Sequence, residues 1–348
     1  MRRIGTWLKW TAMTALMLLG ALAGIGFVWE RRAEQVDALR FPPPGQRVDV
    51  GGYRLHLLCL GTAAAQRPTI VLDTLSAGSS VYWAWIQPAL AKQARVCAYD
   101  RAGFGWSDNS THPPTLAAAV HDLESVLQRG RVAPPYVLVG HSKGGIIVRG
   151  FQHAHPEQVA GLVLLESSHP DQFARYPSLV AESDATLRWM RWVPLAARLG
   201  VMRLYIQPSV LGDGNTFDFG ALPDRERATL AAFWSAPRHW QGTVLEMRAL
   251  HPFFDHVDGL GNLGDLPLAV ITAARNDTTG WQVLQNDLTQ LSRHSRHLIV
   301  PYATHASLVF DPEEAALVSD AILQLWRDAS AASPATSSAA ATRSASAI

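Results

Sequence analysis

The sequence predicts an α/β protein: an eight-stranded, mostly parallel sheet with helices on both faces, a helical cap between strands 6 and 7, and an N-terminal transmembrane helix. Three observations carry this prediction. Eight short apolar runs alternate with helix-sized segments, as in a sheet layered with helices. About a hundred residues separate the sixth run from the seventh. An uncharged apolar stretch lies near the N-terminus.

The apolar stretch at residues 10–29 reads WTAMTALMLLGALAGIGFVW. At about 1.5 Å per residue it is long enough to cross a hydrocarbon core of roughly 30 Å. Trp10 and Trp29 would lie near the two interfaces. We therefore predict a membrane anchor at 10–29, between a basic N-terminal tail at 1–9 and a linker at 30–45.

A cleaved signal peptide is the alternative interpretation of this N-terminus. The sequence Ala21-Leu22-Ala23 resembles a cleavage site, and cleavage there would make Gly24 the first residue. That product would begin with an exposed apolar end, which favours the uncleaved anchor. The short basic tail favours a folded domain on the exported side, periplasmic or extracellular, although arginines also follow the span.

The strands are predicted from the apolar runs. The first two are joined by Gly51-Gly52, a hairpin signal, and should be antiparallel. Helical stretches separate the later strands, which should therefore be parallel. The eight runs are 46–50, 53–60, 69–74, 95–99, 136–139, 161–166, 268–273 and 296–301.

The long interval between the sixth and seventh strands needs structure of its own. Its helical patterns predict a cap over the C-terminal edge of the sheet, at about 167–265, within a folded domain at 46–328. The cap is rich in aromatic residues, most of which we expect to pack inside it. Residues 329–348 are almost wholly Ala, Ser and Thr, which predicts a disordered tail.

Composition excludes some classes of function. The net charge is +1 with 17% charged residues, so nothing favours binding to nucleic acid. The thirteen histidines form no HExxH or similar pattern, and we expect no metal and no cofactor. Cys59 and Cys97 are either buried thiols or, if their strands are neighbours in an exported domain, a disulfide.

The stretch VLVGHSKGG at 137–145 places Ser142 between Gly140 and Gly144, after an apolar run and before a helical segment. Glycines permit a strained turn there and a close approach of helix and strand. A serine on such a turn projects its hydroxyl from the end of the sheet. Ser142 is therefore the candidate nucleophile.

A serine hydroxyl needs a base, and the base needs an orienting acid. Such groups belong on loops beyond the C-terminal ends of strands. His305 follows the last predicted strand, and Asp277 follows the seventh. Glu166 and Asp171, after the sixth strand, are alternative acids.

These residues resemble the α/β-hydrolase superfamily over roughly residues 46–328. Beside the GHSKGG turn, VCAYDRAGFGWSD at 96–108 is similar to the family's strand-four signature. The likeness is to bacterial esterase-like members with a helical cap, and it implies the catalytic triad Ser142, Asp277 and His305. The serine argues against haloalkane dehalogenase and epoxide hydrolase chemistry, for which those relatives use aspartate.

The resemblance also implies an oxyanion hole made of backbone N–H groups. One donor is the backbone N–H of Lys143. The second is the backbone N–H of Ser76, or of Leu75 on a one-residue shift. Both remain open because the loop after the third strand lacks the family's usual His-Gly pair. The Lys143 side chain is expected in solvent. Trp83 and Trp106 are the candidate substrate-binding residues.

The sequence thus predicts a membrane-anchored serine hydrolase acting on carboxylic esters, with amides or thioesters as related substrates. Two alternatives remain open. The same triad serves cofactor-free haloperoxidases and perhydrolases, and a non-catalytic ligand-binding protein could keep the fold. The partners expected are a small ester or acyl substrate and, through residues 10–29, a lipid bilayer.

Overall fold

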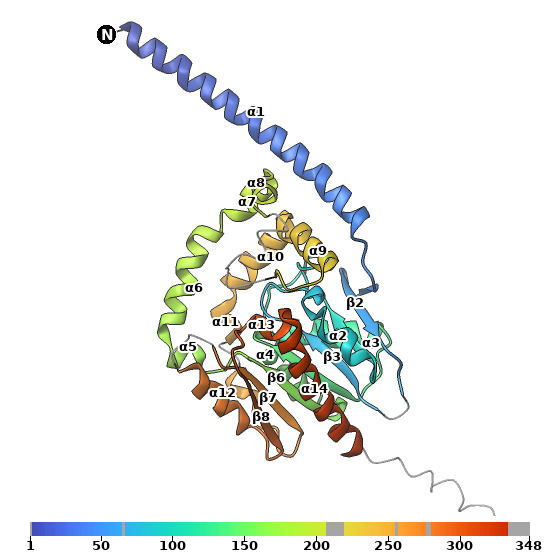
Figure 1. The fold of residues 1–348 in the computed structure, drawn as a ribbon. Coiled ribbons are helices and arrows are strands. Elements are labelled where there is room, and N and C mark those ends of the chain that lie inside the picture. The colour runs from blue at the N-terminus through green and yellow to red at the C-terminus, as the bar shows by residue number, and fades with distance from the viewer. Residues whose placement is uncertain (1, 65–66, 207–218, 255–256, 276–279, 333–348) are drawn as a thin grey trace, which may run out of the picture.

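The central sheet has eight strands in the described residues, in the order β1-β2-β4-β3-β5-β6-β7-β8 (Figure 1). The computed structural model describes residues 2–64, 67–206, 219–254, 257–275 and 280–332. The strands are β1 (Gln46–Asp49), β2 (Arg54–Leu60), β3 (Thr69–Asp73), β4 (Val96–Tyr99), β5 (Tyr136–His141), β6 (Val159–Leu165), β7 (Leu268–Ala273) and β8 (Ser295–Val300).

The pairing of the strands confirms the predicted directions. β2 is antiparallel to both β1 and β4, and every other neighbouring pair is parallel. The β1–β2 turn uses Gly51 and Gly52, whose φ angles are 111° and 105°. The Asp49 carboxylate accepts hydrogen bonds from both of their N–H groups. Glycine is required here because other residues rarely adopt such angles.

Helices cover both faces of the sheet, as predicted, because each inner strand is apolar on both sides. On one face Ile70 and Leu72 of β3 pack in a core with residues of α2 (Ile86–Ala91) and α14 (Pro312–Ala332). On the other face Val71 packs with α3 (Leu116–Arg129) and α4 (Lys143–Ala154). Further elements of the domain are η1 (Ser80–Trp83), η2 (Pro156–Gln158), α12 (Trp281–Thr289) and α13 (Ser307–Phe310).

The predicted helical cap lies between β6 and β7. It covers the edge of the sheet at which the parallel strands end (Figure 1). Its described helices are α5 (Gln172–Arg175), α6 (Pro177–Met190), α7 (Val193–Arg198), α8 (Val201–Tyr205), α9 (Asp224–Ser235), α10 (Pro237–Arg248), α11 (Leu250–Phe254) and η4 (Asp258–Leu260).

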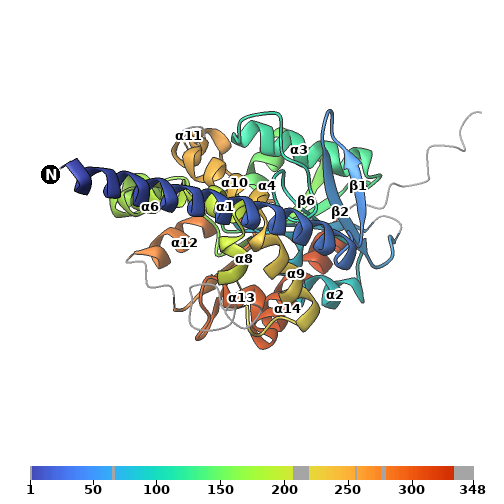
Figure 2. The same ribbon diagram turned by 90° about the horizontal axis from the view of Figure 1, so that it is seen from above.

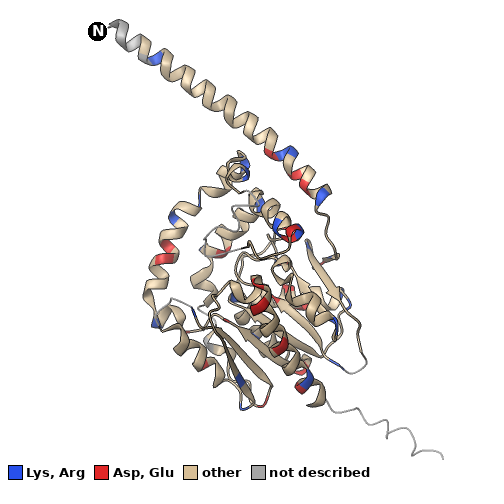
Figure 3. Cartoon of the chain, in the orientation of Figure 1, with Lys and Arg blue, Asp and Glu red and all other residues tan. Residues whose placement is uncertain are grey.

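The N-terminal helix α1 (Arg2–Arg40) is longer than the predicted anchor. It is the one helix in the described residues long and apolar enough to cross a membrane, and its 18-residue apolar window, with a mean hydropathy of 2.0, is unburied. Charged residues gather on its C-terminal part (Figure 3). Of the predicted linker at 30–45, residues 30–40 continue the helix.

Residues 30–40 of α1 are bound to the cap by ion pairs. Arg203 of α8 donates to both carboxylate oxygens of Glu30 at 2.8 Å and to Asp37 at 2.7 Å. Glu30 is buried, and a bidentate pair of this kind fixes orientation as well as distance. The helix therefore continues past the apolar stretch because a partner far away in the sequence binds its polar end.

At the C-terminus α14 continues to Ala332, four residues beyond the domain boundary predicted at 328. The prediction of a disordered tail otherwise falls on residues 333–348, which lie outside the described part of the chain.

The two cysteines form a disulfide between β2 and β4. Cys59 and Cys97 are paired opposite each other in the antiparallel ladder, with their Cα atoms 4.0 Å apart. Of the two interpretations open from the sequence, the structure has the disulfide.

Candidate active site

The turn between β5 and α4 carries Ser142 in a strained conformation. Its φ and ψ angles are 54° and −121°, a region that residues with a side chain rarely adopt. The Ser142 N–H donates to the Leu165 carbonyl at 3.0 Å, and its own carbonyl accepts from Gly145 and Ser168. Hydrogen bonds on both sides thus hold the strained residue, with its side chain half-buried.

The glycines on either side of Ser142 are required by close packing. A Cβ atom on Gly140 would lie 2.5 Å from the backbone of Gly144. A Cβ atom on Gly144 would lie 2.6 Å from the carbonyl oxygen of Asp73 at the end of β3. Real side chains do not approach backbone atoms this closely, so the sequence Gly-x-Ser-x-Gly is what allows helix, turn and sheet to meet here.

His305 lies on the loop after β8, beside this turn. The His141 imidazole nitrogen Nε2 is 3.0 Å from the His305 carbonyl oxygen, to which its N–H form donates. The centroids of the two imidazole rings are 4.9 Å apart. The structure therefore packs His305 against the residue that precedes Ser142, and it brings the predicted serine and histidine to one end of the sheet.

Burial keeps both imidazoles neutral near pH 7. It lowers the pKa of His305 to about 4. Burial, and then the neighbouring His305, lower the pKa of His141 well below its ordinary value. A neutral imidazole can accept a proton, so His305 has the protonation state that a general base needs.

The predicted acid, Asp277, lies outside the described residues. Of the alternatives, Glu166 lies at the end of β6 with a φ angle of 43° and is fully buried. Its carboxylate accepts from the Ala273 N–H at 2.7 Å, at the end of β7. The Asp171 side chain is 53% exposed and lies 4.0 Å from His169. Glu166 is thus a buried carboxylate beside the candidate site, whereas Asp171 faces solvent.

The backbone around the turn offers N–H groups for an oxyanion. Lys143 is the first residue of α4, and the first N–H groups of a helix have no partner within it. The Thr74 carbonyl lies against Gly144, which places the start of the β3 loop beside the turn. Leu75 is buried and Ser76 is exposed there.

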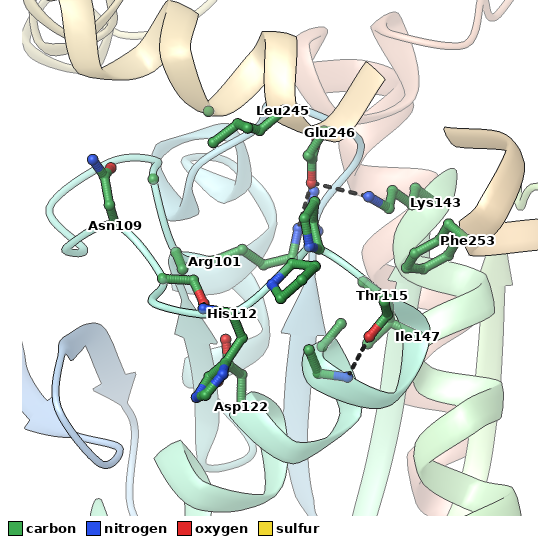
Figure 4. A pocket seen from close by; sticks show the side chains of 18 residues that line it. Arg101, Asn109, His112, Thr115, Asp122, Lys143, Ile147, Leu245, Glu246 and Phe253 are labelled. Carbon is green, nitrogen blue, oxygen red and sulfur yellow. Dashed lines mark hydrogen bonds and ion pairs between the residues drawn. The ribbon is translucent and has the colours of Figure 1, made fainter. Parts of the chain in front are cut away.

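The Lys143 side chain is not in solvent, contrary to the expectation from sequence. It is 4% exposed, and its ammonium group donates to Glu246 of α10 at 3.2 Å. It also lies over the ring of Phe253, 4.3 Å from the centroid. Figure 4 shows Glu246 pointing from the cap helix toward Lys143 and Arg101.

Glu246 is the residue that sequence reasoning missed. It accepts from the Ala77 N–H at 2.9 Å, and Arg101 Nε lies 3.5 Å from it. Burial acts to raise the pKa of Glu246, but Lys143 and Arg101 hold it below the ordinary value. Burial lowers the pKa of Lys143, which Glu246 opposes. One cap carboxylate therefore joins the serine turn to the loop after β3.

The cavity in Figure 4 is separate from the serine and histidine. Its volume is about 90 Å³, and its lining includes Lys143, Glu246 and Phe253 but neither Ser142 nor His305. Among its ionic groups, Glu246 is paired with both Lys143 and Arg101, and Asp122 accepts a hydrogen bond from Tyr53.

The two predicted substrate-binding residues line another cavity, of about 270 Å³. Trp83 is fully buried, and its ring centroid is 6.3 Å from that of His141. Trp106 packs on His56 and donates from its indole N–H to the Phe41 carbonyl. The structure thus brings the two tryptophans together. The described lining of their cavity includes neither Ser142 nor His305.

This sheet, with a strained serine turn after its fifth strand and a cap after its sixth, defines the class of α/β hydrolases. A family model described as the alpha/beta hydrolase fold matches residues 70–312. The chain therefore belongs to the α/β hydrolase fold family.

Similar proteins place the chain among relatives of several kinds. An uncharacterized protein of Schizosaccharomyces pombe is 25% identical over 296 residues, covering 75% of this chain and 52% of that protein. An uncharacterized vacuolar membrane protein of Saccharomyces cerevisiae is 28% identical over 134 residues, covering 34% of this chain and 21% of that protein. An epoxide hydrolase mutant of Vigna radiata superposes with a TM-score of 0.64 at 17% identity, over 81% of this chain and 98% of that chain.

The chain spans about half or less of the length of the two sequence relatives. The likeness to the solved structure is one of fold.

Proposed function

We propose that this protein is a membrane-anchored serine hydrolase that cleaves carboxylic esters through an acyl-enzyme on Ser142. The observation that carries the proposal is the strained Ser142 turn with the neutral His305 loop packed beside it. Strain of this kind persists where the surrounding structure holds it and is typical of functional sites. Amides and thioesters are related substrates of the same chemistry.

In the proposed reaction the Ser142 hydroxyl oxygen bonds to the ester carbonyl carbon while His305 takes its proton. The carbonyl oxygen becomes an oxyanion, stabilised by the backbone N–H of Lys143 and by that of Ser76 or Leu75. The C–O bond to the alcohol then breaks, and the alcohol leaves with the proton from His305. Water attacks the acyl-enzyme by the same proton route and releases the carboxylic acid.

Asp277 is the proposed acid that orients His305, and Glu166 is its main alternative. The buried position of Glu166 at the end of β6 supports the alternative. Asp277→Asn and Glu166→Gln separate the two, because the orienting acid is needed for turnover whereas the other carboxylate is not. If Asp277→Asn keeps full activity while Glu166→Gln, or Asp171→Asn, loses it, Asp277 is the wrong acid.

The apolar part of the substrate is proposed to contact Trp83 and Trp106. A cavity lined by these rings suits an acyl or alcohol chain, because apolar walls with few polar groups are typical of small-molecule sites. Trp106→Ala should raise KM for long-chain esters more than for short ones. An equal effect on both would remove Trp106 from the substrate site.

Residues 10–29 are proposed to anchor the protein in the bilayer, with residues 1–9 on the other side and the domain at 46–328 exported. The unburied apolar window of α1 supports the anchor. The Cys59–Cys97 disulfide supports export, because disulfides persist in oxidising compartments. Removal of the protein from membranes by carbonate, or a mature N-terminus at Gly24, would contradict the anchor.

A fluorophosphonate probe tests the activity itself. The probe phosphonylates activated serines, so the intact protein should be labelled and Ser142→Ala should not. A second variant, Ser168→Ala, is the matched control, because Ser168 lies next to the turn but donates only its backbone N–H to it. No labelling of the intact protein, or equal labelling of Ser142→Ala, would refute the proposal.

A further inference from the structure

The cap exposes a cluster of large apolar side chains at the end of α6 and along α7 and α8. Eleven such side chains outside α1 are exposed in the described part of the chain, and six of them fall within residues 189–205. The six are Trp189 (57% exposed), Trp192 (61%), Leu195 (53%), Val201 (49%), Leu204 (68%) and Tyr205 (67%). We expected most cap aromatics to pack inside the cap, and three of them do not.

The charged residues of the segment itself have one sign. Residues 185–205 contain four arginines and no aspartate or glutamate. Arg191 lies over the ring of Trp192, 5.3 Å from its centroid. Arginine beside exposed tryptophan, tyrosine and leucine is the composition of protein surfaces that lie in the headgroup region of a bilayer.

The cluster is also next to the end of the apolar stretch of α1. A Cβ atom on Gly26 would lie 2.3 Å from the Leu199 carbonyl oxygen, and one on Gly200 would lie 2.7 Å from the Trp29 ring. The turn between α7 and α8 thus touches α1 at residues 26–29, the last helical turn before its charged part begins. Both views show α8 beside α1 at this level (Figures 1 and 2).

The contact is fixed as well as close. Arg203 of α8 binds Glu30 and Asp37, which follow Gly26 on α1 by about one and about three helical turns. The glycine contact and the ion pairs together set both the distance and the rotation of α1 against the cap. A bilayer that holds residues 10–29 therefore has its headgroup region at the level of α7 and α8.

We propose that residues 189–205, here called the α7–α8 surface, lie in the lipid headgroup and upper acyl region of the bilayer that holds α1. The proposal rests on the membrane anchor proposed above. A lipid surface is the occupant that fits, because the apolar side chains adjoin the apolar stretch of α1 and lie among Arg188, Arg191 and Arg198. The cap is then the part of the enzyme in contact with lipid, so esters dissolved in the bilayer reach the cap without first crossing water.

Fluorescence quenching in vesicles tests this arrangement. The full chain, reconstituted in vesicles of phosphatidylcholine and phosphatidylglycerol, carries one labelled cysteine with an environment-sensitive dye. Leu204→Cys and Trp192→Cys report on the α7–α8 surface. Leu317→Cys on α14, 48% exposed, is the matched control for an exposed apolar residue, and Leu19→Cys reports on the proposed span. The native cysteines are already paired.

The expected result is that a spin label on the lipid acyl chain quenches the dye at positions 19, 204 and 192 but not at 317. Aqueous iodide should quench position 204 severalfold less than position 317. Quenching by lipid at 19 but not at 204 and 192 would overturn the α7–α8 proposal alone. No quenching at 19 would overturn the anchor and this proposal with it. Protection from iodide at 204 without quenching by lipid would show a protein on this surface, which also overturns the proposal.

Discussion

The shared carboxylate of Glu246 gives the sharpest stability prediction. Glu246→Gln keeps the shape of the side chain and an acceptor for the Ala77 N–H, but it removes the negative charge between Lys143 and Arg101. Two buried cations then face each other with less compensation. We expect a large loss of stability, together with a looser contact between the cap and the serine turn.

The expected loss of unfolding free energy is estimated from the distances in the two ion pairs and from their burial. At 3.2 Å and 3.5 Å each pair gains about 5 kcal/mol at an effective dielectric constant of about 20, before the cost of burial is subtracted. Removing one partner of a buried pair costs about 3–5 kcal/mol. Arg101 keeps Asp73 as a partner, so the lower end, about 3 kcal/mol, applies. At about 2 °C per kcal/mol the midpoint of thermal unfolding should fall by about 6 °C.

The assay is thermal unfolding of the detergent-solubilised full chain, followed by tryptophan fluorescence. Asp265→Asn is the control, because it breaks an ion pair with Arg293 in which the two side chains are 63% and 72% exposed. Exposed pairs contribute less than about 1 kcal/mol. Lys143→Met in the Glu246→Gln background removes the uncompensated cation and should recover part of the loss. Equal shifts for the two single variants, or no recovery in the double variant, would refute the reasoning.

Three further outcomes are expected. His305 must be neutral to accept a proton, and its pKa is about 4. The value of kcat/KM should therefore stay constant from about pH 7 to about pH 5 and fall with a midpoint near pH 4. A midpoint above about pH 6 would contradict this. Reduction of Cys59–Cys97, which are 38 residues apart, should cost about 3–4 kcal/mol in the same unfolding assay, with a thiol titration to show that the bond is open. Gly144→Ala should lower kcat on the order of a hundredfold, because the new Cβ atom would press on the Asp73 and Thr74 carbonyl oxygens, where the proposed oxyanion loop begins. Gly259→Ala is the control and should leave kcat unchanged, because no atom lies within 4 Å of the new Cβ.

The strands could be predicted because burial on both faces leaves an apolar run that a sequence displays directly. Residues 268–273 match β7 at both ends. The fifth strand runs two residues longer than predicted, to His141, because Gly140 and His141 still pair with β6. Backbone pairing of that kind leaves no mark in hydropathy.

The contacts that the sequence does not reveal involve charged residues whose partners are far away in the chain. Lys143 looks like a surface lysine until Glu246, 103 residues later, is placed on it by the cap. Glu30 and Asp37 look like a linker until Arg203 of α8 binds them. Periodicity predicts that the cap is helical but not where its helices lie, so these contacts could not be foreseen.

The disulfide between β2 and β4 changes the covalent topology of the sheet. It closes residues 59–97 into a ring that contains β3 and α2. A protease that cuts the backbone once anywhere inside this ring leaves a single molecule, because the two pieces stay joined through Cys59 and Cys97. Helix α1 and the serine turn lie on opposite sides of the ring in the sequence, so one such cut does not separate the serine turn from α1.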